Sequence, residues 1–141
     1  MSVPVATNGL NMSVIGHIDL DGKGDGMHVE VLDGVAYLGH MGYNDLGTSI
    51  IDVSDPTRPS LISQIRRPEG THSHKTQVRG DLLLVNHERN RFELSSPETW
   101  SAGLAVLDVS DPAHPTQIGF YPTPGVGVHR MSWWDGDLVY V

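Results

Sequence analysis

A duplicated block constrains the fold of this 141-residue chain more than any other feature. The stretch 47–65, GTSIIDVSDPTRPSLISQI, returns at 103–121 as GLAVLDVSDPAHPTQIGFY. Each copy places an apolar, partly β-branched run before an Asp-Pro dipeptide, which ends the run because Pro cannot donate to a β-ladder. Alternating apolar and polar residues follow, as in a half-buried strand. Each copy therefore predicts a strand, a short turn and a second strand.

A hairpin signal stands before each copy of the block. Two apolar runs flank Asp33-Gly34 in the first unit, and two more flank the turn at 79–81 in the second. An Asp-Gly pair between such runs is a strong predictor of a two-residue hairpin turn. A similar pattern begins again at residue 128 and is cut short by the end of the sequence. We therefore predict four-stranded units at 27–65 and 72–121, a partial unit at 128–141, an outer strand at 13–20 and an N-terminal arm at 1–12.

The motifs IIDVSDP and VLDVSDP resemble the LVIVD-repeat family of β-propellers. The resemblance covers residues 13–141 and implies an all-β propeller of four-stranded blades, with two full blades, part of a third and one outer strand in this chain. An open stack of blades would leave apolar faces and strand edges bare. The expected partners are therefore the remaining blades of a ring of about six to eight, supplied by further chain or by other copies.

Composition excludes several other partners and sites. With 9 basic against 17 acidic residues the formal charge is −8, which argues against nucleic acid and anionic membranes. The chain has 0 Cys, so disulfides and thiolate metal sites are excluded. No apolar run approaches the ~20 residues of a membrane helix, and the N-terminus lacks the pattern of a signal peptide. We expect a cytoplasmic protein, with a processed secreted form as the alternative.

The chain has 8 His, which is unusual for an acidic sequence without Cys. In a propeller, the first strand of each blade lines the central channel. His28, His74 and His129 stand near the start of that strand in the three units, so we predict that they bind a divalent transition metal (Zn, Fe, Mn or Cu). The alternative is that each His only hydrogen-bonds a neighbouring loop.

Further side chains near these positions have predicted roles. Glu30 alternates with His28 on one strand face, so Glu30 or His72 is expected to act as the catalytic base. Lys75 and Arg130 directly follow two of the predicted metal ligands, and their positive charges suit an anionic substrate. His87 stands at the end of the predicted second strand of its unit. Lys75, His87 and Arg130 are therefore the predicted substrate-binding residues.

Two classes of function fit these predictions. In the first, the chain belongs to a metal-dependent enzyme (a hydrolase, lyase or oxygenase) that acts on a small molecule. In the second, it is a non-catalytic propeller module that binds a protein or ligand. The sequence contains no GxSxG elbow, P-loop or dinucleotide fingerprint. An insertion at 88–102, which includes Phe92 and Trp100, fits either class as a lid or a docking loop.

Overall fold

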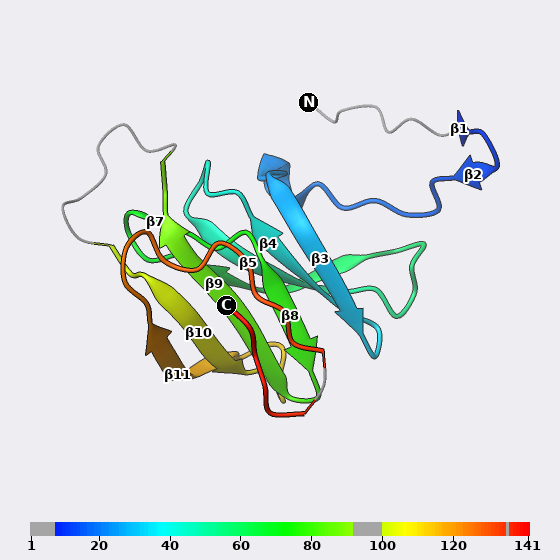
Figure 1. Ribbon diagram of the computed structural model, residues 1–141. Helices are drawn as coiled ribbons and strands as arrows, with labels where there is room; N and C mark the ends of the chain where they lie inside the picture. Colours follow the sequence, from blue (N-terminus) through cyan, green and yellow to red (C-terminus); the bar gives the residue numbers. More distant parts are fainter. Residues whose placement is uncertain (1–7, 92–99, 135) are drawn as a thin grey trace.

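The computed structural model describes residues 8–91, 100–134 and 136–141 (Figure 1). In this part of the chain, regular structure consists of β-strands and a single 3-10 turn, η1 (Leu20–Gly22). Two antiparallel sheets form the body of the protein, and a small hairpin of β1 (Asn8–Gly9) and β2 (Met12–Ser13) stands apart from it. The predicted all-β fold is therefore confirmed. No helix in the described residues is long and apolar enough to cross a bilayer.

The first sheet is a four-stranded meander with the order β3-β4-β5-β6. The turn between its first two strands has positive φ at both Asp33 (48°) and Gly34 (81°), as a tight type I′ hairpin requires. The third strand carries the repeated IIDV run, and its residues 46–51 are all buried. The strands are β3 (Gly26–Leu32), β4 (Val35–His40), β5 (Leu46–Asp52) and β6 (Ser60–Arg66).

The second sheet repeats this meander, but its first strand is interrupted. Two short strands pair end to end with one edge of the next strand, and residues 73–75 separate them. Asn86 compensates for the break, because its side-chain Oδ1 accepts a hydrogen bond from the backbone N–H of Lys75 at 2.7 Å. The strands are β7 (Thr71–His72), β8 (Thr76–Arg79), β9 (Leu82–Arg89), β10 (Gly103–Asp108) and β11 (Thr116–Pro122).

The duplicated DVSDP motif closes the same turn in both sheets. Asp52 accepts hydrogen bonds from the backbone N–H of Ser54 at 2.9 Å and from its hydroxyl at 2.7 Å. Asp108 accepts the equivalent bond from the backbone N–H of Ser110 at 2.9 Å. These Asx turns explain why the motif recurs with its Asp and Ser intact.

The two sheets pack against each other through a common apolar core. Strand β3 of the first sheet contacts β8 of the second, so the first strands of the two units are neighbours. Thr76 on β8 also donates its hydroxyl to the carbonyl of Tyr37 at 3.1 Å. The buried members of the core are Tyr37, Ile50, Val78, Leu83, Val85, Ala105, Leu107 and Val109.

The C-terminal segment, orange to red in Figure 1, covers the outer face of the second sheet. Val128 and Met131 are buried there against Leu84 and Leu104. The hairpin predicted for 128–141 is reduced to one bridge, in which Ser132 and Tyr140 exchange backbone hydrogen bonds of 2.8 and 3.0 Å.

The N-terminal segment differs from the prediction. Residues 14–19 of the outer strand expected at 13–20 belong to no strand, and only Ser13 pairs, within the small hairpin. Val14 and Ile15 are exposed. A strand needs a partner for its backbone groups, and no described strand pairs with this segment.

Candidate metal centre

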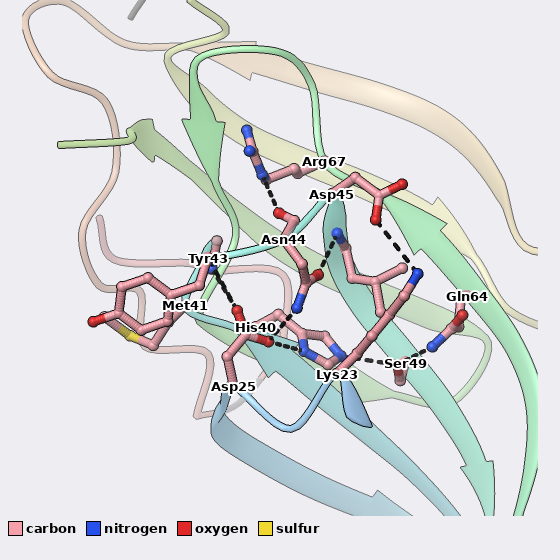
Figure 2. A network of polar contacts seen from close by, with 12 residues as sticks. Lys23, Asp25, His40, Met41, Tyr43, Asn44, Asp45, Ser49, Gln64 and Arg67 are labelled. Atoms are coloured by element: carbon pink, nitrogen blue, oxygen red, sulfur yellow. Dashed lines mark hydrogen bonds and ion pairs between the residues drawn. The ribbon is translucent and has the colours of Figure 1, made fainter. Parts of the chain in front are cut away.

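A buried polar network closes one end of the first sheet (Figure 2). The Asp25 carboxylate lies 2.5 Å from Nδ1 of His40, and Nε2 of the same ring lies 2.8 Å from Oγ of Ser49. The order Asp-His-Ser is that of a catalytic triad. However, His40 and Ser49 are both 0% exposed, so no substrate reaches the hydroxyl. We call this group the Asp25 network and assign it a structural role.

The same carboxylate holds the loop between β4 and β5. Its oxygens accept hydrogen bonds from the backbone N–H groups of Gly42 and Tyr43 and from the Asn44 amide, at 3.0 to 3.1 Å. Together with the bond from His40, these contacts occupy both oxygens of Asp25. The Asp25 carboxylate and the His40 ring are therefore satisfied within the sheet and its loops.

The second sheet instead gathers imidazoles around a carboxylate. One oxygen of Glu88, Oε2, lies 2.8 Å from Nε2 of His72 and 2.7 Å from Nδ1 of His129. One candidate ligand atom from each of His72, His74 and Glu88 lies within 4.8 Å of the others. The ring of His74 is also 5.0 Å from that of His129, centroid to centroid. We call these four residues the histidine cluster.

Strand pairing and the interrupted ladder position the histidine cluster. His72 on β7 stands directly opposite Glu88 on β9. His74 lies in the break between β7 and β8, where Asn86 contacts its Nδ1 at 3.3 Å and donates to the carbonyl of Val128 at 2.8 Å. The second bond ties the C-terminal segment to the sheet, one residue before His129.

The first sheet and its loop pack against the chain segments that carry the histidine cluster. A side chain at Gly39 would come within 2.7 Å of the backbone carbon of His74. At Gly42, where φ is +90°, it would lie 2.7 Å from Cβ of His72. Both positions therefore need the small size of glycine, because the first sheet and its loop touch the segments that carry the cluster.

The hydrogen bonds of His72 indicate which of its ring nitrogens donates. Its Nδ1 lies 3.1 Å from the carbonyl oxygen of Met41, which can only accept, so Nδ1 carries a proton. In the neutral ring the Nε2 lone pair then points at a carboxylate oxygen of Glu88 only 2.8 Å away. Two electron-rich atoms at this distance need a shared proton, or a metal ion that both of them bind. A ligating His commonly fixes its other nitrogen on a carbonyl in this way.

The electrostatics of the histidine cluster also suit a cation. Burial, together with the neighbouring His72 and His129, lowers the pKa of His74 to about 4, so this imidazole is neutral at pH 7. For Glu88, burial raises the pKa, but the close contacts with His129 and His72 outweigh this effect and hold it below its usual value. The cluster therefore presents a neutral imidazole beside an ionised carboxylate.

A cavity of about 290 Å³ opens over the histidine cluster. Besides the four cluster residues, its walls come from Met27, Met41, Arg89 and Arg91. The guanidinium of Arg89 also stacks over the ring of Trp100, 4.5 Å from the ring centroid. Trp100 belongs to the predicted insertion at 88–102, whereas Phe92 lies outside the described residues.

The structure brings together two of the three predicted metal ligands. His74 and His129 lie in the histidine cluster, together with His72, which was predicted as a base. His28 lies elsewhere, with its Nδ1 accepting a 3.5 Å hydrogen bond from the backbone N–H of Thr76. Glu30 accepts a bond from the backbone N–H of Val78 at 2.9 Å, so it joins β3 to β8.

The three predicted substrate-binding residues lie outside the histidine cluster. Lys75 and Arg130 share a second cavity with His28, and the pKa of Lys75 is lowered by burial and by the charge of Arg130. His87 is 6% exposed, and its Nδ1 lies 2.9 Å from the hydroxyl of Ser101. Burial lowers the pKa of His87 to about 4.

Glu88 was not predicted as a ligand. The available signal was its place at the polar end of a strand that is otherwise apolar, in the run Asn86-His87-Glu88. The chain alone could not reveal that the break at 73–75 turns His74 toward this carboxylate, because the break appears only in the pairing of the folded sheet.

The duplicated meander defines an antiparallel all-β repeat protein. The family model for the LVIVD repeat matches residues 23–66 and 99–123, which span the first sheet and the last two strands of the second. The chain thus carries LVIVD repeats, which are associated with β-propeller folds. A comparison with curated proteins gives no match.

Proposed function

We propose that this chain forms part of a β-propeller whose histidine cluster binds one divalent transition metal for chemistry on a small molecule. The propeller part is supported by the LVIVD repeats and by the two meander sheets, which pack with their first strands adjacent, as neighbouring blades do. The C-terminal segment would then begin a third blade. The remaining blades would come from further chain or from other copies.

One observation carries the metal proposal. His72 donates from Nδ1 to the Met41 carbonyl while its Nε2 faces the Glu88 carboxylate at 2.8 Å. A cation held by both His72 and Glu88 would resolve this contact and would leave the Nδ1 hydrogen bond in place. The revised ligand set is His72, His74, Glu88 and His129, in place of the set with His28 that the sequence predicted.

The donor set indicates which ions fit. Imidazole nitrogens with one carboxylate oxygen are typical of catalytic zinc sites and of non-haem iron and manganese sites. The cavity over the histidine cluster leaves room for a water molecule or a substrate atom at the metal. An ion in this position would polarise a bound carbonyl or phosphoryl group or lower the pKa of a bound water. We therefore favour a metal-dependent enzyme over a passive binding module.

Metal binding is tested on the purified protein after treatment with a chelator. Zn²⁺, Mn²⁺ and Fe²⁺ are added separately, and bound metal is measured by mass spectrometry after desalting. We expect one ion per chain, and a loss of affinity of at least about a hundredfold in both Glu88→Gln and His72→Gln. The control is His114→Gln, because His114 is exposed in a surface turn, where it pairs with Asp111.

The same contacts allow a purely structural alternative. A proton instead of a metal would make His72 an imidazolium, and His72 and His129 would both donate to Glu88 and fasten the C-terminal segment to the sheet. In that case none of the three metals binds, or both variants keep the affinity of the unchanged protein. Bound metal without metal-dependent turnover of small ester and phosphoester substrates would contradict the enzyme and favour the binding module.

A further inference from the structure

A second cavity lies beside the histidine cluster and has a different chemical character. It measures about 340 Å³, and Lys75 and Arg130 supply its charge. We call it the cationic hollow. The remaining residues of its lining are His28, Thr76, Gln77, Met131 and Ser132.

No carboxylate in the described part of the chain lines the cationic hollow. This is unusual, because the chain carries a net charge of −8. Among the described residues, neither Lys75 nor Arg130 forms an ion pair. Glu30, the acidic residue on the adjacent strand, accepts bonds from the backbone of Val78 and the amide of Gln77 instead. Two neighbouring cations without a carboxylate repel each other, and a bound anion would remove that repulsion.

The groups around the cationic hollow donate hydrogen bonds. His28 accepts from the backbone N–H of Thr76 through Nδ1, so Nε2 is the ring nitrogen that carries a proton and can donate. The Arg130 guanidinium matches the two oxygens of a carboxylate or phosphate in a bidentate pair. The Lys75 ammonium adds a compact charge with three further donors.

The cationic hollow is separate from the histidine cluster, although the two share their chain segments. His74 and His129 line the cavity over the cluster, whereas the next residues, Lys75 and Arg130, line the cationic hollow. From these donors and charges we infer that the cationic hollow binds the acidic group of a small molecule, a carboxylate or a phosphate. The inference goes beyond the proposed metal function and does not depend on a bound metal.

The test uses the full chain after treatment with a chelator, so that metal binding cannot contribute. Inorganic phosphate and succinate are titrated separately and followed by calorimetry and by the NMR signals of backbone amides. We expect saturable binding of at least one of them, weakened about tenfold or more by Lys75→Gln and by Arg130→Gln, because each change removes a charge-assisted hydrogen bond. Lys75→Arg should retain binding, and added NaCl should weaken it.

The matched control is Arg58→Gln, which removes an exposed arginine that pairs with Asp55 away from the hollow. It should bind as the unchanged protein does. Arg130 is exposed, so Arg130→Gln tests the site even if a change at the half-buried Lys75 disturbs folding. Absence of binding by both anions, or equal binding by Arg130→Gln and Arg58→Gln, overturns the inference. A stronger response to phosphate or to succinate identifies the acidic group.

Discussion

The two sheets use the same repeat position in different ways. In both, the second strand carries a histidine at the matching repeat position, His40 at the end of β4 and His87 within β9. His40 lies between a carboxylate and a hydroxyl, those of Asp25 and Ser49. His87 instead contacts a single hydroxyl, that of Ser101, at 2.9 Å, and it packs 5.5 Å from the ring of Phe120.

The substitutions behind this difference can be read from the repeat register. Val31 and Val78 occupy matching positions in the two repeats. Counted back from these residues, Asp25 and His72 also match. The second repeat therefore has an imidazole where the first has its central carboxylate. The carboxylate of the second repeat is Glu88, one residue after its histidine, where the first repeat has Met41.

This exchange changes what the polar groups can do. In the first sheet, Asp25, His40 and Ser49 bond to one another, and Asp25 also holds a loop, so these groups contribute to stability. In the second, the imidazoles crowd around a single carboxylate beneath a cavity. Similar strands can therefore carry a structural network in one repeat and a candidate reactive centre in the next, because a few polar positions were exchanged.

The largest effect on folding is expected from Asp25→Asn. The amide group keeps the shape but removes the charge and one acceptor from a site where four donors converge. We expect the free energy of unfolding to fall by about 2–4 kcal/mol, because bonds to a buried charge are lost. Urea unfolding at pH 7 measures this, with the exposed Asp21→Asn as the control.

Metal content sharpens the same test. Asp25→Asn should leave bound metal unchanged while Glu88→Gln removes it, if the two polar groups have separate roles. Loss of metal in Asp25→Asn without loss of stability would contradict the separation.

Gly39→Ala is expected to lower stability less than Asp25→Asn does, and also to lower the affinity for metal. The added methyl group would press on the backbone of His74 across the sheets. We expect a cost of about 1–3 kcal/mol from overpacking and a loss of metal affinity of about tenfold from the displaced ligand. The control is Gly24→Ala, where an added Cβ would meet no atom within 4 Å. Equal metal affinity in the two variants would show that the first sheet does not position the site.

The smallest effect concerns the turn that both repeats share. Hydrogen bonds from Ser54 and Ser110 lower the pKa of Asp52 and of Asp108, respectively. Because each pKa is lowered in the folded state, the stabilisation is present above the ordinary value of 3.8 and is lost as the pH falls through the folded value. Asp52→Asn and Asp108→Asn should therefore each reduce the acid sensitivity of unfolding.

Urea unfolding between pH 3 and pH 6 gives this comparison directly. The two variants should lose a similar part of the pH dependence, because the turn has the same Asp-to-Ser hydrogen bond in both sheets. If only one variant lost pH dependence of unfolding, the turn would play different roles in the two sheets, as the polar groups around His40 and His87 do.

Much of the fold could be predicted from the sequence, because its signals are local. The duplicated block, the Asp33-Gly34 turn and the Asp-Pro stops gave the strands of both sheets. The predictions differed from the structure where a strand depends on a partner far along the chain. The segment 13–20 has the apolar pattern of a strand, but no described strand pairs with its residues 14–19.

For the candidate site, too, some features follow from the sequence and others only from the tertiary structure. The sequence by itself determined an all-β repeat protein with an excess of histidine and no thiol ligands, since repeat, turn and composition are properties of short stretches. Only the tertiary structure decided which histidines meet. His72 and Glu88 are 16 residues apart and face each other because β7 pairs with β9, and His129 joins them because the C-terminal segment packs over the second sheet. Such contacts depend on pairing and packing between distant segments, and residue types and spacing do not encode them locally.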